Sequence, residues 1–545
     1  MYSYNRTIII GNHYSLDGNS SSHYSSLSPS NCISIVKLNI FKKGSIHFVC
    51  NDDEIKLCSL LCHLLAINPF QSVSIQNLSP PVTKFNIFYS SAFLLIFFIY
   101  TILYILLGFA LLFIGSLLGS YIRPQKFNSL ATYRHCIYFT SSLIRPSLRG
   151  GAIGHIKGVL SVINSHMPVS LFSTRDFFSE LPISNFPRKF VQYFYPEFII
   201  PDIDIYALAV SFHQILAFCR NFSCFSLFAS KQVFIYTRFS RGSFAAALIS
   251  SFFRLPLVVE YNGSEVSISK LYSTYNYPFS FLSLYAENFV LNSASRVVTV
   301  SEVLANELSC RYPDKTIKWY PNCADLKLTA VTPNRPRDYI SFSYASTFGR
   351  WHGADIIPIS LDYMIKHPLL YPSQNLPKFK FHIVGNGITY ANFIDLITRL
   401  SLDDFFELHG SLPHEETLRI ISDSHFSLLP TSRPIDDSPF IGSPTKLFEY
   451  MALGSIPIAS NLDQQFSVIY PSLSFSDPSL FLNSSSTICD DLMGLVFEAD
   501  SYRAFADALY FACSNYKSIS HVHANCRSRV VASFTWDANV SNLLG

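Results

Sequence analysis

Short apolar runs alternate with amphipathic segments along most of the chain, from about residue 134 to the end. Runs of this kind, bounded by polar turns and separated by segments with helical periodicity, predict a parallel sheet covered by helices. The pattern therefore predicts an α/β fold with two tandem Rossmann-like domains, over residues 134–310 and 320–545. We expect strands at residues 136–140, 233–236, 257–260, 297–300, 339–344, 380–384, 406–409, 426–430 and 456–459.

Residues 1–83 follow a different pattern. Residues 1–30 are rich in Ser, Asn and Tyr, and we expect them to be loose. Strands are expected at residues 33–40, 45–50 and 72–75, with a helix from Asp52 to about residue 67. This part of the chain is predicted to be a small α+β region, and its role does not follow from its sequence.

Between these parts lies a long uncharged segment, residues 84–123. No charged residue occurs from 85 to 122, and the centre is almost wholly apolar. About 20 such residues span a bilayer, so we expect a membrane-spanning helix or a shallow hairpin broken near Gly108. Positive residues follow the segment, namely Arg123, Lys126 and Arg134, which places the two α/β domains in the cytoplasm. The alternative is a buried core helix.

Composition narrows the class of protein. The chain has 545 residues, enough for several domains, and a net charge of +3, so nucleic acid is not an expected partner. Charged residues make up only 14%, in part because of the apolar segment. The 12 cysteines are scattered without the spacing of a metal-ligand set, and we expect them to be reduced thiols in a cytosol-facing protein.

The segment 439–460 carries the most specific chemistry. A small-residue loop, Gly442 to Thr445, leads into a helix expected at 446–453, which Gly454 ends before an apolar strand. A loop that feeds a helix N-terminus leaves backbone N–H groups that suit a phosphate. Lys446 adds a positive charge, and Glu449, one turn later, can accept hydrogen bonds from a sugar diol. These features predict a nucleotide-diphosphate site, and the alternative is an ordinary strand–helix–strand crossover.

The wording SPTKLFEYMALGSIPIAS resembles the nucleotide-sugar loop of the group-1 (family-4) glycosyltransferases, which are retaining enzymes of the GT-B fold. The resemblance implies that Glu449 binds the donor ribose and that Lys446 lies near the donor phosphates. One position departs from the family pattern, because Ile441 stands where an acidic residue often precedes the loop. This departure weakens one role and leaves Lys446 and Glu449 to carry more of the donor site. The donor loop is expected to include Ser443, Pro444, Thr445 and Leu447.

Two groups of polar residues are expected on the first domain's side of the ligand cleft. Gly150 and Gly151 permit a tight turn beside a ligand, and His155 follows in the next helix. By the resemblance, this loop contacts the donor diphosphate or the acceptor, and His155 contacts a sugar. Glu260 and Asn262 follow the apolar strand at 257–260, where α/β proteins place ligand contacts, and we expect them at the acceptor side. Ordinary turn chemistry is the alternative for both groups.

Two further glycine-containing turns are expected in the second domain. Gly349 and Arg350 follow its first strand, and the resemblance implies that Arg350 contacts the donor diphosphate. Many relatives have a lysine about where His352 stands. Gly385 and Gly387 follow the next strand, in a turn whose backbone often meets the base or ribose. The alternative for Arg350 is a solvated arginine in a loop.

The resemblance implies a membrane-associated hexosyltransferase that builds a surface polysaccharide or glycolipid. It moves a sugar from a nucleotide diphospho-sugar to a glycan or lipid-linked acceptor with retention of configuration. Neither a metal nor another cofactor is expected, and the Asp-x-Asp of the chain, Asp202 to Asp204, is interpreted as a polar turn. The alternative is a non-catalytic, nucleotide-sugar-binding GT-B scaffold at the membrane, which Ile441 and His352 favour.

Overall fold

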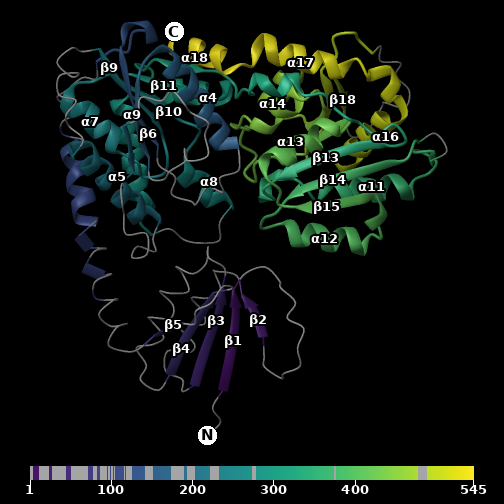
Figure 1. The fold of residues 1–545 in the computed structure, drawn as a ribbon, viewed down its shortest axis with the longest axis horizontal. Helices are drawn as coiled ribbons and strands as arrows, with labels where there is room; N and C mark the ends of the chain where they lie inside the picture. The colour runs from purple at the N-terminus through teal and green to yellow at the C-terminus, as the bar shows by residue number, and fades with distance from the viewer. Residues whose placement is uncertain are drawn as a thin grey trace.

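The computed structural model contains three sheets, two of them seven-stranded and covered by helices (Figure 1). It describes residues 4–10, 24–27, 44–50, 71–77, 83–85, 125–140, 151–173, 189–192, 203–220, 232–272, 278–373, 376–476 and 488–545, and, between 95 and 117, residues 95, 98–99, 102–103, 105–115 and 117. The two seven-stranded sheets confirm the expected α/β architecture.

The first large sheet has the strand order β12-β11-β10-β9-β6-β7-β8, and all its neighbouring strands are parallel. Its central strands are buried on both faces, as their apolar sequences predict. The strands are β6 (His135–Thr140), β7 (Val169–Ser173), β8 (Lys189–Gln192), β9 (Val233–Arg238), β10 (Leu257–Glu260), β11 (Arg296–Thr299) and β12 (Ile317–Trp319). The helices are α4 (Gly151–His166), α5 (Ile203–Arg220), α7 (Ala245–Phe253), α8 (Glu265–Tyr272), α9 (Ser280–Ser293) and α10 (Glu302–Arg311).

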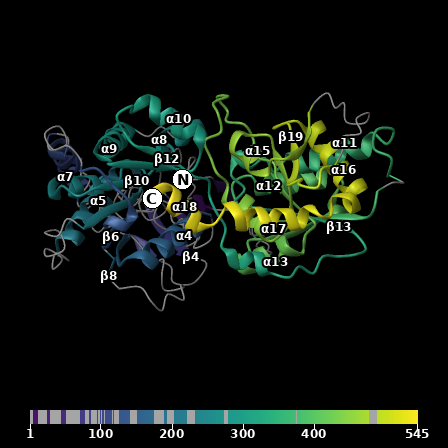
Figure 2. The ribbon, with the colours of Figure 1, turned by 90° about the horizontal axis from the view of Figure 1, so that it is seen from above.

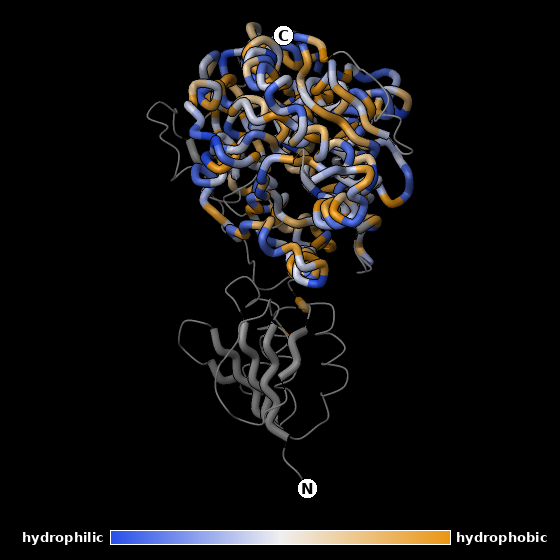
Figure 3. The backbone as a smooth tube through the Cα atoms, turned by 90° about the vertical axis from the view of Figure 1, so that its right-hand side faces the viewer, coloured by the Kyte–Doolittle hydropathy of each residue, from blue (hydrophilic) through white to orange (hydrophobic). Residues whose placement is uncertain are grey.

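The second large sheet has the order β15-β14-β13-β16-β17-β19-β18, again with all neighbours parallel. Hydrophobic and hydrophilic stretches alternate along the chain through both domains (Figure 3). The strands are β13 (Ile340–Ser346), β14 (Phe379–Gly385), β15 (Phe406–Gly410), β16 (Phe426–Leu429), β17 (Ile456–Ser460), β18 (Ser472–Phe475) and β19 (Gly494–Phe497). The helices are α11 (Ile356–Lys366), α12 (Tyr390–Arg399), α13 (His414–Asp423), α14 (Thr445–Ala452), α15 (Asp463–Ile469), α16 (Tyr502–Ile519), α17 (Val522–Ser533) and α18 (Trp536–Leu544).

The last helix returns to the first domain. α17 and α18 run from the second sheet back toward the first (Figure 2). Three apolar residues of α18, Val540, Leu543 and Leu544, belong to the core that covers one face of the first sheet. Arg296 of β11 donates to the Leu543 carbonyl at 2.9 Å, which fixes the end of the helix. The C-terminal helix therefore ties the two domains together.

The N-terminal region forms a five-stranded sheet of order β2-β1-β3-β4-β5, in which only the β4–β5 pair is antiparallel. β3 (Gly44–Cys50) and β4 (Gln71–Asn77) lie where strands are expected, and β5 spans Thr83–Phe85. β1 (Tyr4–Ile10) and β2 (Tyr24–Leu27) lie in the stretch expected to be loose. That expectation is wrong for these residues, because the Thr-Ile-Ile-Ile run in β1 is rich in β-branched side chains. The strand expected at 33–40 and the helix at 52–67 lie outside the described residues.

The described part of the apolar segment includes a helix at Ile105–Gly115 that packs on the first domain. Leu112 is fully buried, Gly108 lies against Leu208 of α5, and Gly115 lies against Phe289 of α9. The opposite face exposes large apolar side chains. Together with apolar residues described on either side of this helix, they are Leu95, Phe98, Ile99, Ile102, Leu103, Leu106, Phe109, Phe113, Ile114 and Leu117.

Among the described residues, one helix is both long and apolar enough to cross a bilayer, and it is α5. About 61% of its apolar window is buried inside the protein, so α5 has the burial of a core helix. Asp204 lies in the first turn of α5 and is fully buried. Its two carboxylate oxygens accept hydrogen bonds from Arg241 at 2.7 and 2.9 Å. The interpretation of Asp204 as part of a polar turn is therefore wrong, because a buried arginine pairs with it.

Candidate functional site

A cleft of about 1260 Å³ lies between the two large sheets. Residues from the carboxyl ends of strands line it on both sides. Arg238 ends β9 and Asn262 follows β10 in the first domain, while Ser346 ends β13 and Gly385 ends β14 in the second. The carboxyl edge of a parallel sheet is where α/β proteins bind ligands, so this cleft is the candidate functional site.

Helix α14 brings Lys446 and Glu449 into the cleft. The Lys446 ammonium donates to the Ala345 carbonyl at 3.2 Å and lies 5.6 Å from the centre of the Tyr344 ring. One turn later, Glu449 Oε1 lies 3.5 Å from His414 Nε2. Burial lowers the pKa of Lys446 to about 8 and raises the pKa of Glu449 to about 7. Both groups are thus held where desolvation disfavours their charged forms.

The loop before α14 is fixed by Asn322, which lies between the domains. The Asn322 backbone N–H donates to Ser443 Oγ at 3.0 Å. Its side-chain amide donates to the Ser443 carbonyl and, at 3.2 Å, to Thr445 Oγ1. Pro444 stands between these two residues as the N-cap of α14. Asn322 therefore positions the first turn of α14, whose early N–H groups have no partner within the helix.

The same asparagine connects the loop to the first domain. Asn322 Oδ1 lies 2.5 Å from His155 Nδ1, and His155 Nε2 lies 2.9 Å from Glu260 Oε1. Glu260 also accepts hydrogen bonds from Tyr236, Arg238 and Asn262 at 2.6 to 3.0 Å. Burial alone would raise the Glu260 pKa, but nearby His155 and Arg238 hold it well below its usual range. A continuous polar network thus joins β10, α4 and the donor-type loop.

Some expected site residues do not reach the cleft. Glu260 is only 2% exposed and serves the network behind the cleft surface, while Asn262 lines the cleft. Leu447 is fully buried in the core of the second domain, and its N–H donates to the Pro444 carbonyl. Neither the side chain nor the backbone N–H of Leu447 is therefore free for a ligand, so its assignment to the donor site is wrong.

Arg350 also lies outside the cleft, on an exposed surface. It begins a short 3₁₀ turn, Arg350–His352, in which His352 Nδ1 accepts the Gly349 N–H at 2.9 Å. This turn directs Trp351 and His352 toward the cleft instead. Burial, with a smaller effect from Lys446, lowers the His352 pKa to about 2, so the ring is neutral. Arg350 therefore does not line this cleft, where the diphosphate contact was expected.

The glycines after β14 serve close backbone approach. Gly385 lines the cleft with φ of 123°, and a Cβ there would lie 1.7 Å from the Ser346 carbonyl oxygen. A Cβ on Gly387 would lie 1.9 Å from the Thr347 carbonyl oxygen. In the first domain, Gly151 begins α4, and Gly150 lies outside the described residues. Glycine at 385 and 387 is thus required by the fold beside the cleft.

The cleft residues to which the sequence analysis assigned no role include Arg238, Asn322, Trp351 and His414. Arg238 and His414 had a usable signal, because one ends a strand and the other begins a helix at the carboxyl edge of a sheet. Asn322 lies in a Pro-Asn segment near the domain crossover, but its role had no local signal, because its contacts come from residues 121 or more positions away. Nothing in the sequence singled out Trp351.

Comparisons with known proteins agree with this architecture. No protein-family model matches the chain, and no curated protein does. A glycosyltransferase from Rickettsia africae has 15% identity, a TM-score of 0.52, and coverage of 75% of this chain and 96% of its own. The sucrose-phosphate synthase of Thermosynechococcus elongatus has 16% identity, a TM-score of 0.52, and coverage of 75% of this chain and 96% of its own. Anabaena HepE, in complex with UDP and glucose, has 14% identity, a TM-score of 0.50, and coverage of 75% of this chain and 97% of its own. The two large sheets and their helices therefore have the GT-B type of fold found in glycosyltransferases.

Proposed function

We propose that this protein is a retaining glycosyltransferase that moves a sugar, of the hexosyl type, from a nucleotide diphospho-sugar to a glycan or lipid-linked acceptor. The single observation that carries the proposal is the pairing of Lys446 and Glu449 on α14, at the floor of an interdomain cleft with room for such a donor. Anabaena HepE has a similar fold and was solved in complex with UDP and glucose, which is consistent with the proposed donor site.

In the proposed donor site, Glu449 accepts hydrogen bonds from the ribose diol. Lys446 and the first N–H groups of α14 bind the diphosphate. Arg238 lines the cleft from the first domain with a side chain about 21% exposed, and Glu260 holds its guanidinium at 2.6 Å. We assign it the diphosphate contact expected of Arg350. His155 acts as a positioning residue, because both of its ring nitrogens face protein groups.

The proposed chemistry needs no protein nucleophile. The bond from the sugar C1 to the β-phosphate oxygen breaks, and its electron pair leaves with the nucleoside diphosphate. The acceptor hydroxyl oxygen bonds to C1 on the same face, and its proton passes to the leaving diphosphate. This scheme asks the protein for charge and positioning, and it requires no metal or other cofactor at the cleft.

The first domain's side of the cleft supports a lipid-linked acceptor. Its lining is rich in apolar side chains that a sugar alone would not cover. They are Ile268, Leu271, Leu284, Val303 and Leu304, and Ile441 of the second domain packs against the same core. An acceptor with an apolar carrier would bury this surface, which fits synthesis of a polysaccharide or glycolipid at a membrane.

We also propose that the apolar segment holds the protein at the membrane, with the two large domains in the cytoplasm. One face of the helix at Ile105–Gly115 packs on the first domain, which leaves the other face for lipid. Replacing Leu106, Phe109 and Phe113 together by serine should reduce co-sedimentation with lipid vesicles. The far-ultraviolet circular dichroism spectrum should not change. Unchanged sedimentation would contradict membrane attachment by this face.

The exposed position of Arg350 favours a second candidate, a nucleotide-sugar-binding scaffold without catalysis. The deciding experiment is a screen of nucleotide sugars that measures both binding and released nucleoside diphosphate. The enzyme should release the diphosphate with at least one donor, and Glu449→Ala should abolish the release while the protein stays folded. Asp395→Ala, which removes an exposed carboxylate of α12, is the matched control. Full turnover by Glu449→Ala would overturn the proposal, and binding without turnover would support the scaffold.

A further inference from the structure

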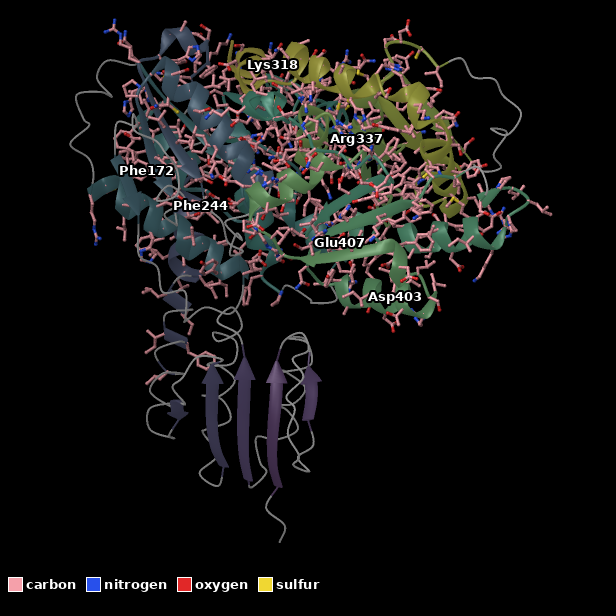
Figure 4. The ribbon with its side chains drawn as sticks, turned by 45° about the vertical axis from the view of Figure 1, so that its right-hand side comes forward. Phe172, Phe244, Lys318, Arg337, Asp403 and Glu407 are labelled. Atoms are coloured by element: carbon pink, nitrogen blue, oxygen red, sulfur yellow. The ribbon has the colours of Figure 1, made fainter. Side chains whose placement is uncertain are left out.

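A second cavity, of about 680 Å³, lies in the second domain beside the edge strand β15, on which Figure 4 labels Glu407. It shares Leu412 with the interdomain cleft, but the two cavities use different faces of α13. His414, Thr417 and Ile421 line the cleft, whereas a separate set of α13 residues lines the second cavity. That set is Glu416, Arg419, Ile420 and Asp423.

Three side chains with metal-binding groups project into this cavity from adjacent strands. His382 on β14 pairs directly with Glu407 on β15, so their side chains lie on the same face of the sheet. His409 follows Glu407 by two positions, at an irregularity where the register between the strands shifts. Such bulges redirect side chains and often occur at functional sites. The three ligand groups therefore come together through the strand geometry itself.

The distances between the donor atoms suit one shared ion. His382 Nδ1 lies 3.2 Å from His409 Nε2. The Glu407 carboxylate oxygens lie 3.5 Å from His382 Nδ1 and 3.7 Å from His409 Nε2. A tetrahedral zinc ion with ligands at about 2.0–2.1 Å separates its ligand atoms by about 3.3 Å. The two carboxylate distances involve different oxygens, Oε2 toward His382 and Oε1 toward His409, and each spacing is close to that between two ligand atoms of such a shell.

The surroundings also suit a cation. Arg335 lines the cavity but donates to the carbonyls of Ser424 and Gly454 at 3.0 and 2.7 Å. The remaining positive side chain, Arg419, is outnumbered by the carboxylates of Glu407, Glu416 and Asp423.

We propose that His382, Glu407 and His409 form a binding site for a divalent transition-metal ion such as Zn²⁺. Two imidazoles and a carboxylate form a ligand set that binds zinc in preference to magnesium or calcium. The fourth position faces the cavity, where water or Glu416 completes the shell. Because the site uses the other face of α13, the ion takes no part in the proposed transfer. It would instead fix the irregular pairing of β14 and β15.

The test is a zinc titration of the full-length protein, after treatment with a chelator, by isothermal calorimetry. One zinc ion should bind per chain, and Co²⁺ in its place should give the visible absorption of a tetrahedral site. The double variant His382→Gln/His409→Gln should bind zinc at least about 100-fold more weakly. His367→Gln, at an exposed histidine that ends α11, should bind as the unchanged protein does.

Stability in chelator separates loss of the site from loss of the fold. The unchanged protein and the double variant should unfold at similar temperatures in chelator, and only the unchanged protein should gain stability with zinc. If the double variant is less stable in chelator, Glu407→Gln takes its place, because that side chain is about 53% exposed. Equal zinc affinity in the unchanged protein and the ligand variants, or no zinc binding at all, would overturn the proposal.

Discussion

At the scale of single residues, the site depends on charged groups that are costly to bury. Lys446 and Glu449 lie one helical turn apart. Desolvation lowers the pKa of Lys446 and raises the pKa of Glu449, so it favours the neutral form of each. A nucleotide diphosphate would restore partners to both, since its anionic oxygens attract the ammonium and its ribose hydroxyls donate to the carboxylate. The ligand-free protein thus holds strain in these two groups that binding relieves.

This strain gives a prediction for Glu449→Gln. The folded-state pKa of Glu449, about 7, is above its ordinary 4.5, so folding disfavours the ionised form. Stability is therefore lost as pH rises from 4.5 to 7. The substitution should stabilise the ligand-free protein at pH 8 by at most about 3 kcal/mol, and by nearly nothing at pH 4.5. Loss of the counter-charge to Lys446 reduces the gain.

Urea unfolding at the two pH values measures this difference. Asp395→Asn, at an exposed carboxylate on α12, should show no such dependence on pH. If Glu449→Gln changes the free energy of unfolding by the same amount at both pH values, then Glu449 is not desolvated. The same variant should lose nucleotide affinity, because an amide accepts hydrogen bonds from the ribose less strongly than a carboxylate.

The residues that the sequence could and could not identify differ in how local their signal is. Lys446 and Glu449 were predictable, because a loop, a helix start and a one-turn spacing lie within a few positions. Arg350 was placed wrongly, because the direction of its side chain depends on the His352–Gly349 hydrogen bond in a short turn. Asn322 could not be assigned, because its partners come from α4 and the loop before α14.

At the scale of elements, strand positions follow from local apolar runs. The buried strand β10 begins and ends at the predicted residues, and β17 differs by one. The geometry of the residues that end strands is harder to predict from sequence, because it depends on neighbouring strands. Gly385 and Gly410 illustrate this. Both adopt positive φ, but only Gly385 lies against another backbone segment, where a Cβ would be 1.7 Å from the Ser346 carbonyl oxygen.

This contrast predicts different effects for Gly385→Ala and Gly410→Ala. The Gly410 substitution should cost about 1–2 kcal/mol, since it adds only the strain of a left-handed residue. The Gly385 substitution adds a clash with the backbone at the end of β13, and it should cost more than about 3 kcal/mol in total and weaken nucleotide binding. Chemical denaturation and nucleotide titration check both effects. Equal stabilities of the two variants would contradict the close approach of Gly385 to Ser346.

At the scale of the whole molecule, the arrangement of the two domains depends on α18. Its first residue, Trp536, packs over Gly158 of α4, and the centres of its ring and the His155 ring lie 5.0 Å apart in an edge-to-face arrangement. Asn539 of the same helix donates to the Pro321 carbonyl at 3.1 Å, next to Asn322. The predicted boundary at residue 320 separates the two sheets but does not reveal this return, because the sequence of α18 does not say which sheet it packs on. The geometry of the cleft thus depends on contacts between residues more than 200 positions apart.

Gly158→Ala tests this dependence, with Gly154→Ala as its control. A Cβ on Gly158 would lie 2.2 Å from the Trp536 indole, whereas a Cβ on Gly154, one turn earlier in α4, meets nothing within 4 Å. The first substitution should displace Trp536 and with it His155, and so lower kcat by about 100-fold through misalignment of the two halves of the cleft. Nucleotide binding should change less than kcat, since Lys446 and Glu449 lie on α14 in the other domain and His155 reaches its first turn only through Asn322. The second should leave kcat unchanged and stabilise the helix by up to about 1 kcal/mol. If Gly158→Ala keeps full activity, then the packing of α18 on α4 does not set the alignment of the cleft.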